Sequence, residues 1–366
     1  MFASFPDFGD NSRALYEYMM RQEEFNEWTF VWEVSPNYNF PLRERTTFIR
    51  TPKGYGSRDY LIYIYHLFTS KYLFCTHSSF VEANPSVQVS VCLWHGTMLK
   101  RICAMNEREK DGQRKDQYRF FVAPSNYYVN IFCQTFLCKL EKVIVAGYPR
   151  NDFLFEDTSV LEKLNIDKNL YDKIVVYMPT FRVPKGGGYC DSDSIVQSCI
   201  DLNNKQSLSE LSDFLEKNNA LLLIKWHPAD SREASVDGWS NIKSVNNTML
   251  LSADIQTYQL LHYADALITD YSSVFCDYML LDRPIAFDVS DIDSYADKRG
   301  FVFTNPIDYM PGYILKNDRD LMSFIEDVAK GVDQGMTKRH DLYHIYNSFK
   351  DNNASKRIIN MLIKGL

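Results

Sequence analysis

The chain has 366 residues, of which 45% are hydrophobic and 24% charged, and its formal net charge is −7. This length corresponds to about two domains of common size, and the composition is that of a globular protein with packed cores. The acidic balance argues against a general nucleic-acid-binding protein, which usually carries a basic surface. We therefore expect no nucleic acid among the partners.

The cysteines and the first residues bear on the cellular compartment. The eight cysteines are scattered, and none forms a Cys-x-x-Cys pair. This pattern predicts free thiols in a reducing compartment. The start of the chain lacks the basic residues and long apolar core of a signal peptide, and no apolar run approaches the roughly 18 residues needed to span a bilayer. We expect a cytoplasmic protein that could still be peripheral on the inner face of the cell membrane.

The first half of the chain alternates strand-like and helix-like segments. Strands are predicted at residues 29–34, 72–75, 88–94, 120–123 and 142–146, and helices at residues 11–21, 58–67 and 125–136. Strands that alternate with helices predict βαβ units and a parallel sheet.

The second half repeats this pattern. Strands are predicted at residues 173–178, 221–226, 266–268 and 284–287, and helices at residues 208–217, 258–263, 274–281 and 318–331. With a domain boundary in the polar stretch 156–171, we predict an α/β fold of two Rossmann-like domains, 1–155 and 156–337, with an interdomain cleft. The basic, helical segment 338–366 is expected to pack back on the first domain or to lie on an anionic surface.

The segment Leu267-Ile-Thr-Asp-Tyr-Ser-Ser-Val-Phe-Cys-Asp-Tyr-Met-Leu280 is the most informative in the chain. A buried strand ends at Asp270, and Ser272 and Ser273 follow where a helix would begin. A helix start with serine hydroxyls is typical of a phosphate or diphosphate site. Asp270 is expected to orient the hydroxyls. Asp277 would reach a ribose or polyol hydroxyl, or support the loop.

A second motif, Trp94-His-Gly-Thr-Met-Leu-Lys100, follows the strand predicted at 88–94. The side chain of His95 has the proton affinity that suits proton transfer near neutral pH. Gly96 permits a positive φ or close backbone approach, Thr97 could cap a following helix, and Lys100 adds positive charge. A core histidine beside a helix cap is the alternative, which the surrounding motif disfavours.

Three further groups follow predicted strands. Arg182 in Pro179-Thr-Phe-Arg182 suits the binding of a diphosphate oxygen or a surface salt bridge. Thr180 in the same motif would contact the diphosphate-bearing donor substrate or support the loop. His227 could bind a phosphate or close a strand end. Arg150, in Gly147-Tyr-Pro-Arg-Asn-Asp152, is a phosphate candidate. The loop 185–188 is either a lid or a solvent loop.

Two Asp-x-Asp pairs, at residues 191–193 and 291–293, have the letters of a metal site. Neither follows a predicted strand end, and we interpret both as solvated or structural. No metal and no cofactor is expected, so a diphosphate would be bound by arginine, lysine, histidine, serine and a helix dipole.

Together these motifs resemble the CDP-glycerol glycerophosphotransferase family, the teichoic acid primases and polymerases. Lys225-Trp-His-Pro228, Arg283-Pro-Ile-Ala-Phe287 and Arg299-Gly-Phe301 also fit the family. The resemblance covers nearly the whole chain. It departs at Met98, where the family usually has proline, and at Trp226, where a basic residue is usual, which leaves substrate choice open but not the reaction.

The resemblance implies a GT-B-like fold and metal-independent transfer of glycerol phosphate from CDP-glycerol, with release of CMP. It implies that His95 is the catalytic base, in an acceptor domain 1–155, and that Arg182, His227, Ser272 and Ser273 contact the donor diphosphate in a domain 156–337. The acceptor would be a polyol phosphate, a lipid-linked precursor or a capsular saccharide.

Three other functions stay open. A CDP-ribitol or nucleotide-sugar transferase would keep the fold and change the donor. A nucleotide-sugar epimerase would share the architecture. A non-catalytic nucleotide-binding partner belongs to a different class, and the intact His95 motif argues against it.

Overall fold

We describe the fold from a computed structural model. It covers residues 1–37, 40–77, 80, 82–106, 117–180, 198–202, 204–227, 236 and 238–365. The described chain forms two compact units. Unit 1 comprises Met1–Gly96, Cys103–Phe153 and Ile345–Leu366, and unit 2 comprises Thr97–Ile102 and Leu154–His344. Residues 97–102 and 338–344 thus cluster with unit 2, whereas we had expected them in the first domain and in the terminal segment.

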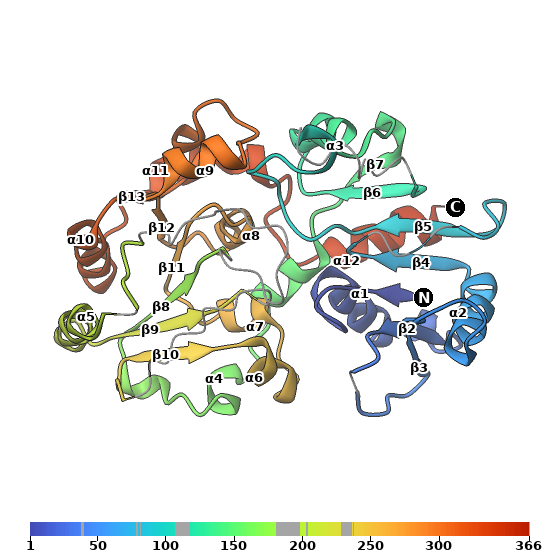
Figure 1. The fold of residues 1–366 in the computed structure, drawn as a ribbon, viewed down its shortest axis with the longest axis horizontal. Coiled ribbons are helices and arrows are strands. Elements are labelled where there is room, and N and C mark those ends of the chain that lie inside the picture. The colour runs from blue at the N-terminus through green and yellow to red at the C-terminus, as the bar shows by residue number, and fades with distance from the viewer. Residues whose placement is uncertain are drawn as a thin grey trace. The chain divides into compact units, whose positions relative to one another are not determined.

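Unit 1 is built on a seven-stranded sheet in the order β3-β2-β1-β4-β5-β6-β7, in which every neighbouring pair is parallel (Figure 1). Its strands are β1 (Phe2–Ala3), β2 (Phe30–Val34), β3 (Thr46–Arg50), β4 (Tyr72–Cys75), β5 (Val89–Cys92), β6 (Phe120–Ala123) and β7 (Val143–Val145). Its helices are α1 (Asp10–Met20), α2 (Arg58–Thr69), α3 (Tyr128–Phe136) and α12 (Ala354–Ile359). The sequence analysis missed β1 and β3.

Unit 2 is built on a six-stranded parallel sheet in the order β10-β9-β8-β11-β12-β13. Its strands are β8 (Lys173–Met178), β9 (Ala220–Lys225), β10 (Ile242–Val245), β11 (Ala266–Thr269), β12 (Ile285–Asp288) and β13 (Tyr313–Leu315). Its helices are α4 (Val160–Lys163), α5 (Lys205–Lys217), α6 (Asn247–Ser252), α7 (Thr257–Leu261), α8 (Val274–Tyr278), α9 (Ile292–Lys298), α10 (Asp318–Ala329) and most of α11 (Met336–Tyr346). The sequence analysis missed β10 and β13.

Each sheet has one point where the strand order reverses, which we call the switch point. It lies between β1 and β4 in unit 1 and between β8 and β11 in unit 2. Both strand orders are those of doubly wound Rossmann-type sheets. The predicted α/β class with two Rossmann-like parallel sheets is therefore confirmed.

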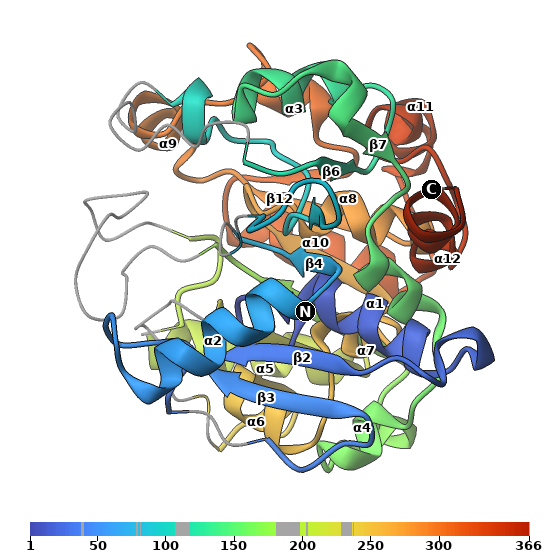
Figure 2. The ribbon, with the colours of Figure 1, turned by 90° about the vertical axis from the view of Figure 1, so that its right-hand side faces the viewer.

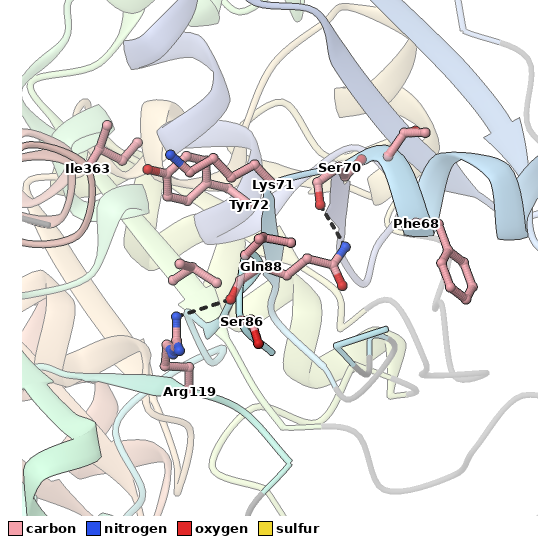
Figure 3. Close-up of a pocket in the computed structure, with 11 residues that line it drawn as sticks. Phe68, Ser70, Lys71, Tyr72, Ser86, Gln88, Arg119 and Ile363 are labelled. Carbon is pink, nitrogen blue, oxygen red and sulfur yellow. Dashed lines mark hydrogen bonds between the residues drawn. The ribbon is translucent and has the colours of Figure 1, made fainter. Parts of the chain in front are cut away.

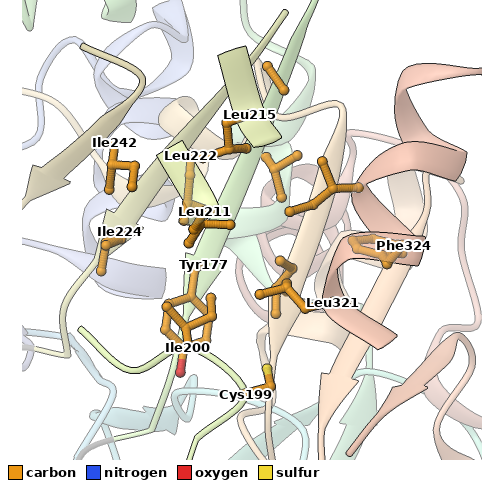
Figure 4. Close-up of a cluster of buried hydrophobic side chains, with 14 of the residues drawn as sticks. Tyr177, Cys199, Ile200, Leu211, Leu215, Leu222, Ile224, Ile242, Leu321 and Phe324 are labelled. Carbon is orange, nitrogen blue, oxygen red and sulfur yellow. The ribbon is translucent and has the colours of Figure 1, made fainter. Parts of the chain in front are cut away.

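The cores explain why the strands read as continuous apolar runs. All six residues of β9 are buried, as expected for a parallel strand covered on both faces. In unit 2, Leu222 and Ile224 of β9 belong to one buried cluster with Leu211 and Leu215 of α5 and with Phe324 of α10 (Figure 4).

The C-terminal segment completes the core of unit 1. Ile358, Ile359 and Leu362 lie in the same buried cluster as Phe2 and Trp32, and α12 contacts α1. In Figure 2, α1 and α2 lie on the side of this unit that faces the viewer. Because these apolar side chains are buried in protein, they are not available to lie on a membrane surface. The segment contains most of α11, all of α12 and a final π-helical turn, Asn360–Lys364, in line with its predicted helical pattern.

Candidate active site

The switch point of unit 2 carries the first group of predicted site residues. Asp270 directly follows β11, and Thr180 follows β8 by two residues. The Asp270 carboxylate accepts hydrogen bonds from the Thr180 N–H, at 2.9 and 3.1 Å, and from the Thr180 hydroxyl, at 2.7 Å. Both residues are buried. Asp270 therefore joins the two strand ends at the place where sheets of this type bind ligands.

Ser272 and Ser273 lie beside this carboxylate, half-buried. The Ser272 N–H donates to Asp270 Oδ1 at 3.2 Å, whereas the Ser273 side chain makes no capping hydrogen bond to α8. The serine cap expected for α8 is therefore not formed, and Asp270 instead binds the backbone just before the helix. α8 has five residues and continues as a 3₁₀ turn, Met279–Leu281, so its dipole contributes less to an anion site than a full helix would.

Asp277 points into the interior of unit 2. Its residue is fully buried, and Oδ2 accepts a hydrogen bond from the Tyr258 hydroxyl at 2.5 Å. A carboxylate in this position supports the packing of α7 against α8. Of the two predicted roles of Asp277, these contacts favour support of the loop over a contact with a ribose or polyol hydroxyl.

His227 lies two residues after β9, which neighbours β8 in the sheet, and it is half-buried. The preceding Lys225 is buried and donates from Nζ to the Trp226 carbonyl at 2.8 Å and to Asn247 Oδ1 at 2.6 Å. Lys225 is thus used inside the unit. Arg182, the loop 185–188, the pair at 191–193 and Pro228 lie outside the described residues.

His95 follows β5 at the carboxyl edge of the unit 1 sheet. Its Nδ1 lies 3.3 Å from the carbonyl oxygen of Thr76, which follows β4. A carbonyl can only accept, so the Nδ1 of the neutral ring carries the proton, and Nε2 carries the lone pair. The His95 side chain is half-buried, and its ring also contacts that of Trp94, with centroids 3.9 Å apart. This tautomer is the one a general base needs at Nε2.

The backbone before His95 is strained and is held by Asn11. Trp94 has φ of 55°, in the left-handed region, which costs about 1–3 kcal/mol for such a residue. The Asn11 side-chain amide donates to the Trp94 carbonyl at 2.7 Å and to the Leu93 carbonyl at 3.3 Å. The Trp94 ring packs edge-on against Phe136. These contacts fix the turn that carries His95.

Arg150 holds the same loop from another side. Its Nη1 donates to the His95 carbonyl at 2.8 Å and to Asp10 Oδ1 at 2.9 Å, and its backbone N–H donates to Asn11 Oδ1 at 3.0 Å. The Arg150 side chain is 7% exposed and that of Asp10 is 11% exposed. The sequence names Arg150 only as a candidate for binding phosphate. The structure instead uses it, within unit 1, to position the His95 backbone.

The rest of this motif departs from expectation after Gly96. Gly96 has φ of 142°, in agreement with the predicted positive φ. Thr97 caps no helix, because residues 97–102 form extended chain in which Lys100 pairs with Phe301. Thr97 is 1% exposed and its hydroxyl makes no hydrogen bond within the described residues, while Lys100 is half-buried.

His77 is a residue of this site that the sequence analysis missed. It follows β4 at the unit 1 switch point, and its ring stacks on that of His95, with centroids 4.2 Å apart and planes 3° apart. His77 lies two residues after β4, so a rule that looks for titratable side chains within a few residues of a buried strand end would identify both histidines.

A cavity of about 530 Å³ lies at the opposite edge of the unit 1 sheet (Figure 3). Lys71, Tyr72, Gln88 and Val89, which line it, stand at the starts of β4 and β5. Arg119 also lines it and donates to the Gln88 carbonyl at 3.2 Å. None of the predicted site residues is among those that line this cavity.

The structure also bears on metals, thiols and membrane spans. The described residues contain no group of three or more histidine, cysteine or acidic side chains arranged to hold a metal ion. Asp291 accepts a hydrogen bond from the Tyr271 hydroxyl at 2.8 Å, which agrees with a structural role. Seven cysteines within the described part are free thiols. None of the described helices combines the length and apolar character that crossing a bilayer requires.

Comparison with known proteins gives consistent matches along the chain. A teichoic acid glycerol-phosphate transferase of Staphylococcus aureus is 26% identical over 98% of this chain and 90% of its own length. A teichoic acid poly(glycerol phosphate) polymerase of Bacillus spizizenii is 28% identical over 97% of this chain and 89% of its own length. A poly(ribitol-phosphate) polymerase of the same species is 23% identical over 98% of this chain, which spans 54% of that relative.

A solved structure of the wall teichoic acid polymerase TagF superposes with a TM-score of 0.76 at 24% identity, covering 100% of this chain and 88% of that one. The fold is thus a GT-B-like α/β fold. The model of the CDP-glycerol:poly(glycerophosphate) glycerophosphotransferase family matches residues 1–364. The chain belongs to this family and is an enzyme of teichoic acid biosynthesis.

Proposed function

We propose that this enzyme transfers glycerol phosphate from CDP-glycerol to a hydroxyl of its acceptor, with His95 as general base. The observation that carries the proposal is the hydrogen bond from His95 Nδ1 to the Thr76 carbonyl. It leaves the Nε2 lone pair of the neutral ring to accept the proton of an acceptor hydroxyl. General base catalysis by a positioned histidine contributes typically about 10²–10⁴-fold in rate.

The proposed step moves one proton and exchanges one P–O bond for another. The acceptor oxygen bonds to the β-phosphorus of CDP-glycerol as its proton passes to His95 Nε2. The bond between the β-phosphorus and the bridging oxygen breaks, and CMP leaves with the electron pair. The acceptor is then extended by one glycerol phosphate.

For donor binding we propose His227, Ser272 and Ser273, with Arg182 as a further contact. Ser272 and Ser273 stand after β11, which flanks the switch point of unit 2, where doubly wound sheets bind nucleotides, and His227 stands after β9, the neighbour of β8. Thr180 and Asp270 hold this edge together. Donors arranged before the reaction stabilise the developing negative charge of the leaving phosphate, commonly the largest catalytic contribution.

The test measures CMP release from CDP-glycerol, CDP-ribitol and a UDP-sugar, each with a polyol-phosphate acceptor and with EDTA present. We expect CMP release from CDP-glycerol that EDTA leaves unchanged. His95→Asn should lower the rate about 10²–10⁴-fold, while His66→Asn in α2 should keep the wild-type rate. UDP release without CMP release, or full activity in His95→Asn, would contradict the proposal.

CDP-ribitol is the second candidate donor, because a ribitol-phosphate polymerase is among the relatives. The two alcohols differ in length, and a pocket discriminates added CHOH groups only modestly unless it hydrogen-bonds them. The ratio of kcat/KM for the two donors in the same assay decides between them.

We also propose that the protein meets its acceptor at an anionic membrane surface. Leu61, Tyr65 and Phe68 of α2 are 62–64% exposed, and Lys71 follows the helix. Exposed apolar side chains next to a cation suit the boundary between lipid head groups and acyl chains. Sedimentation with phosphatidylglycerol vesicles should be lost when all three apolar residues become serine, and unchanged sedimentation would contradict this surface.

A further inference from the structure

His77 and His95 form a stacked pair at the carboxyl edge of the unit 1 sheet. They follow the neighbouring strands β4 and β5, and their rings lie parallel within 3° at a centroid distance of 4.2 Å. The flat contact closes one face of the His95 imidazole, so rotation of that ring about its side-chain bonds is opposed by a second ring.

Thr76 connects the two rings. Its carbonyl accepts from His95 Nδ1 at 3.3 Å, and its hydroxyl lies 2.9 Å from His77 Nδ1. The same hydroxyl accepts from the Phe5 N–H at 3.2 Å, and it has one proton of its own that it can donate to His77 Nδ1. This arrangement suits a neutral His77 with its proton on Nε2.

We propose that His77 is a positioning residue that holds the His95 ring, in the tautomer with the proton on Nδ1, at the angle needed for proton transfer. The inference rests on the proposed role of His95 as general base. A neutral His77 also leaves room for the charge that His95 gains in the reaction, because two like charges four ångströms apart would repel each other. His77 itself exchanges no proton with the substrate.

The location of the pair supports this role over a purely structural one. His77 lies at the switch point between β1 and β4, the edge where doubly wound sheets place their ligands. Phe5, which follows β1, contacts the His77 ring edge-on at 5.8 Å and is 52% exposed. The ring is thus placed between a partly exposed aromatic side chain and the proposed base, at the functional edge of unit 1.

The test compares His77→Ala, which removes the ring, with His77→Phe, which keeps a flat ring but loses the nitrogen atoms. A displaced catalytic group can cost up to about 10²-fold in rate. We expect His77→Ala to lower kcat about 10- to 100-fold with KM for the donor unchanged. His77→Phe should keep a kcat much closer to that of the wild type. His66→Ala in α2 is the matched control and should keep the wild-type kcat.

A second readout follows the tautomer directly. ¹⁵N chemical shifts of the His95 ring nitrogens should report a protonated Nδ1 in the wild type and in His77→Phe, and a mixture of tautomers in His77→Ala. This measurement applies to folded protein with or without activity. It also separates a displaced base from an unfolded loop.

The outcomes distinguish the two proposals. Wild-type kcat and an unchanged His95 tautomer in His77→Ala, with His95→Asn inactive, would overturn the role of His77 and leave the proposed base intact. His77→Phe as impaired as His77→Ala would overturn positioning by the ring face. Full activity of His95→Asn would instead overturn the proposed function itself.

Discussion

The two units fix the loops at their strand ends with groups of opposite charge. In unit 1 a guanidinium and an amide, those of Arg150 and Asn11, donate to the backbone carbonyls around His95. In unit 2 the carboxylate of Asp270 instead gathers N–H and O–H donors from two loops. A carboxylate exposed beside a diphosphate would repel it, but Asp270 is 3% exposed and its oxygens accept these hydrogen bonds.

The difference shows what each loop has to present. The loop of unit 1 presents one side chain, His95, at a defined angle, so its backbone carbonyls are the atoms to be fixed. The edge of unit 2 is proposed to present hydroxyls and an imidazole to an anion. The hydrogen bonds from Thr180 and Ser272 offset the negative charge of the buried Asp270 carboxylate, which lowers its repulsion of a negative ligand.

Replacing Arg150 by methionine tests the unit 1 arrangement and has the largest expected effect. The substitution leaves the Asp10 carboxylate, 11% exposed, without its buried partner. Breaking such a pair lowers the free energy of unfolding by about 3–5 kcal/mol, which urea denaturation measures. Arg50→Met, at the exposed end of β3, is the control and should stay within about 0.5 kcal/mol of wild type. An Arg150→Met loss as small as that of the control would remove the contrast between the units.

Asp270→Asn tests the unit 2 arrangement. Asparagine keeps one acceptor oxygen and turns an N–H₂ toward the Thr180 donors, so charge-assisted hydrogen bonds are lost. We expect the free energy of unfolding to fall by about 1.5–3 kcal/mol and KM for the donor to rise. Thr180→Val, which removes only the hydroxyl bond, should cost less. Equal losses in the two variants would mean that the carboxylate is not the common anchor.

Asp152→Asn has the smallest expected effect. It sharpens the comparison because Asp152 is a carboxylate in unit 1 that accepts backbone N–H bonds, as Asp270 does in unit 2. It accepts from Ala354 and Ser355 at 3.0 Å each. Burial raises its pKa, and the hydrogen bonds from Ser355 and Ala354 and the charge of Arg357 oppose this in part.

Because the folded-state pKa lies above the ordinary value of 3.8, the stability that Asp152 contributes is fully present below that value. It is lost as the pH rises through the folded-state pKa. The unfolding free energy of the wild type relative to Asp152→Asn should therefore decrease with rising pH and then level off. Urea titrations of both proteins at several pH values measure this difference, and an increase with pH would refute the assignment.

The sequence predicted much of the fold because its signals were local. Runs such as residues 221–226 are apolar enough to be assigned as buried strands, and Gly96 marks a positive φ without any tertiary information. Two of the strands it missed, β3 and β10, are partly exposed and carry polar residues such as Thr46 and Lys243, so their apolar pattern is weak.

The candidate site was predicted in part for a related reason. Asp270 and His95 follow strong strand signals, so their places at sheet edges could be expected. The partners of Arg150 and Asp277 could not, because Arg150 pairs with Asp10 across 140 positions of the chain, and nothing near Asp277 in the sequence points to Tyr258. The predicted helix cap at Thr97 was wrong, because residues 97–102 form no helix although threonine is suited to capping one.

The return of the chain into unit 1 has a consequence for biosynthesis. Ile358, Ile359 and Leu362 supply part of that unit's core, so its packing is incomplete until residues 358–362 have left the ribosome. Unit 2 ends at His344 and can close earlier. Domains usually mature from the amino terminus onward during translation. Here the unit that starts first finishes last, and a nascent chain paused near residue 345 would expose the apolar face that α12 covers.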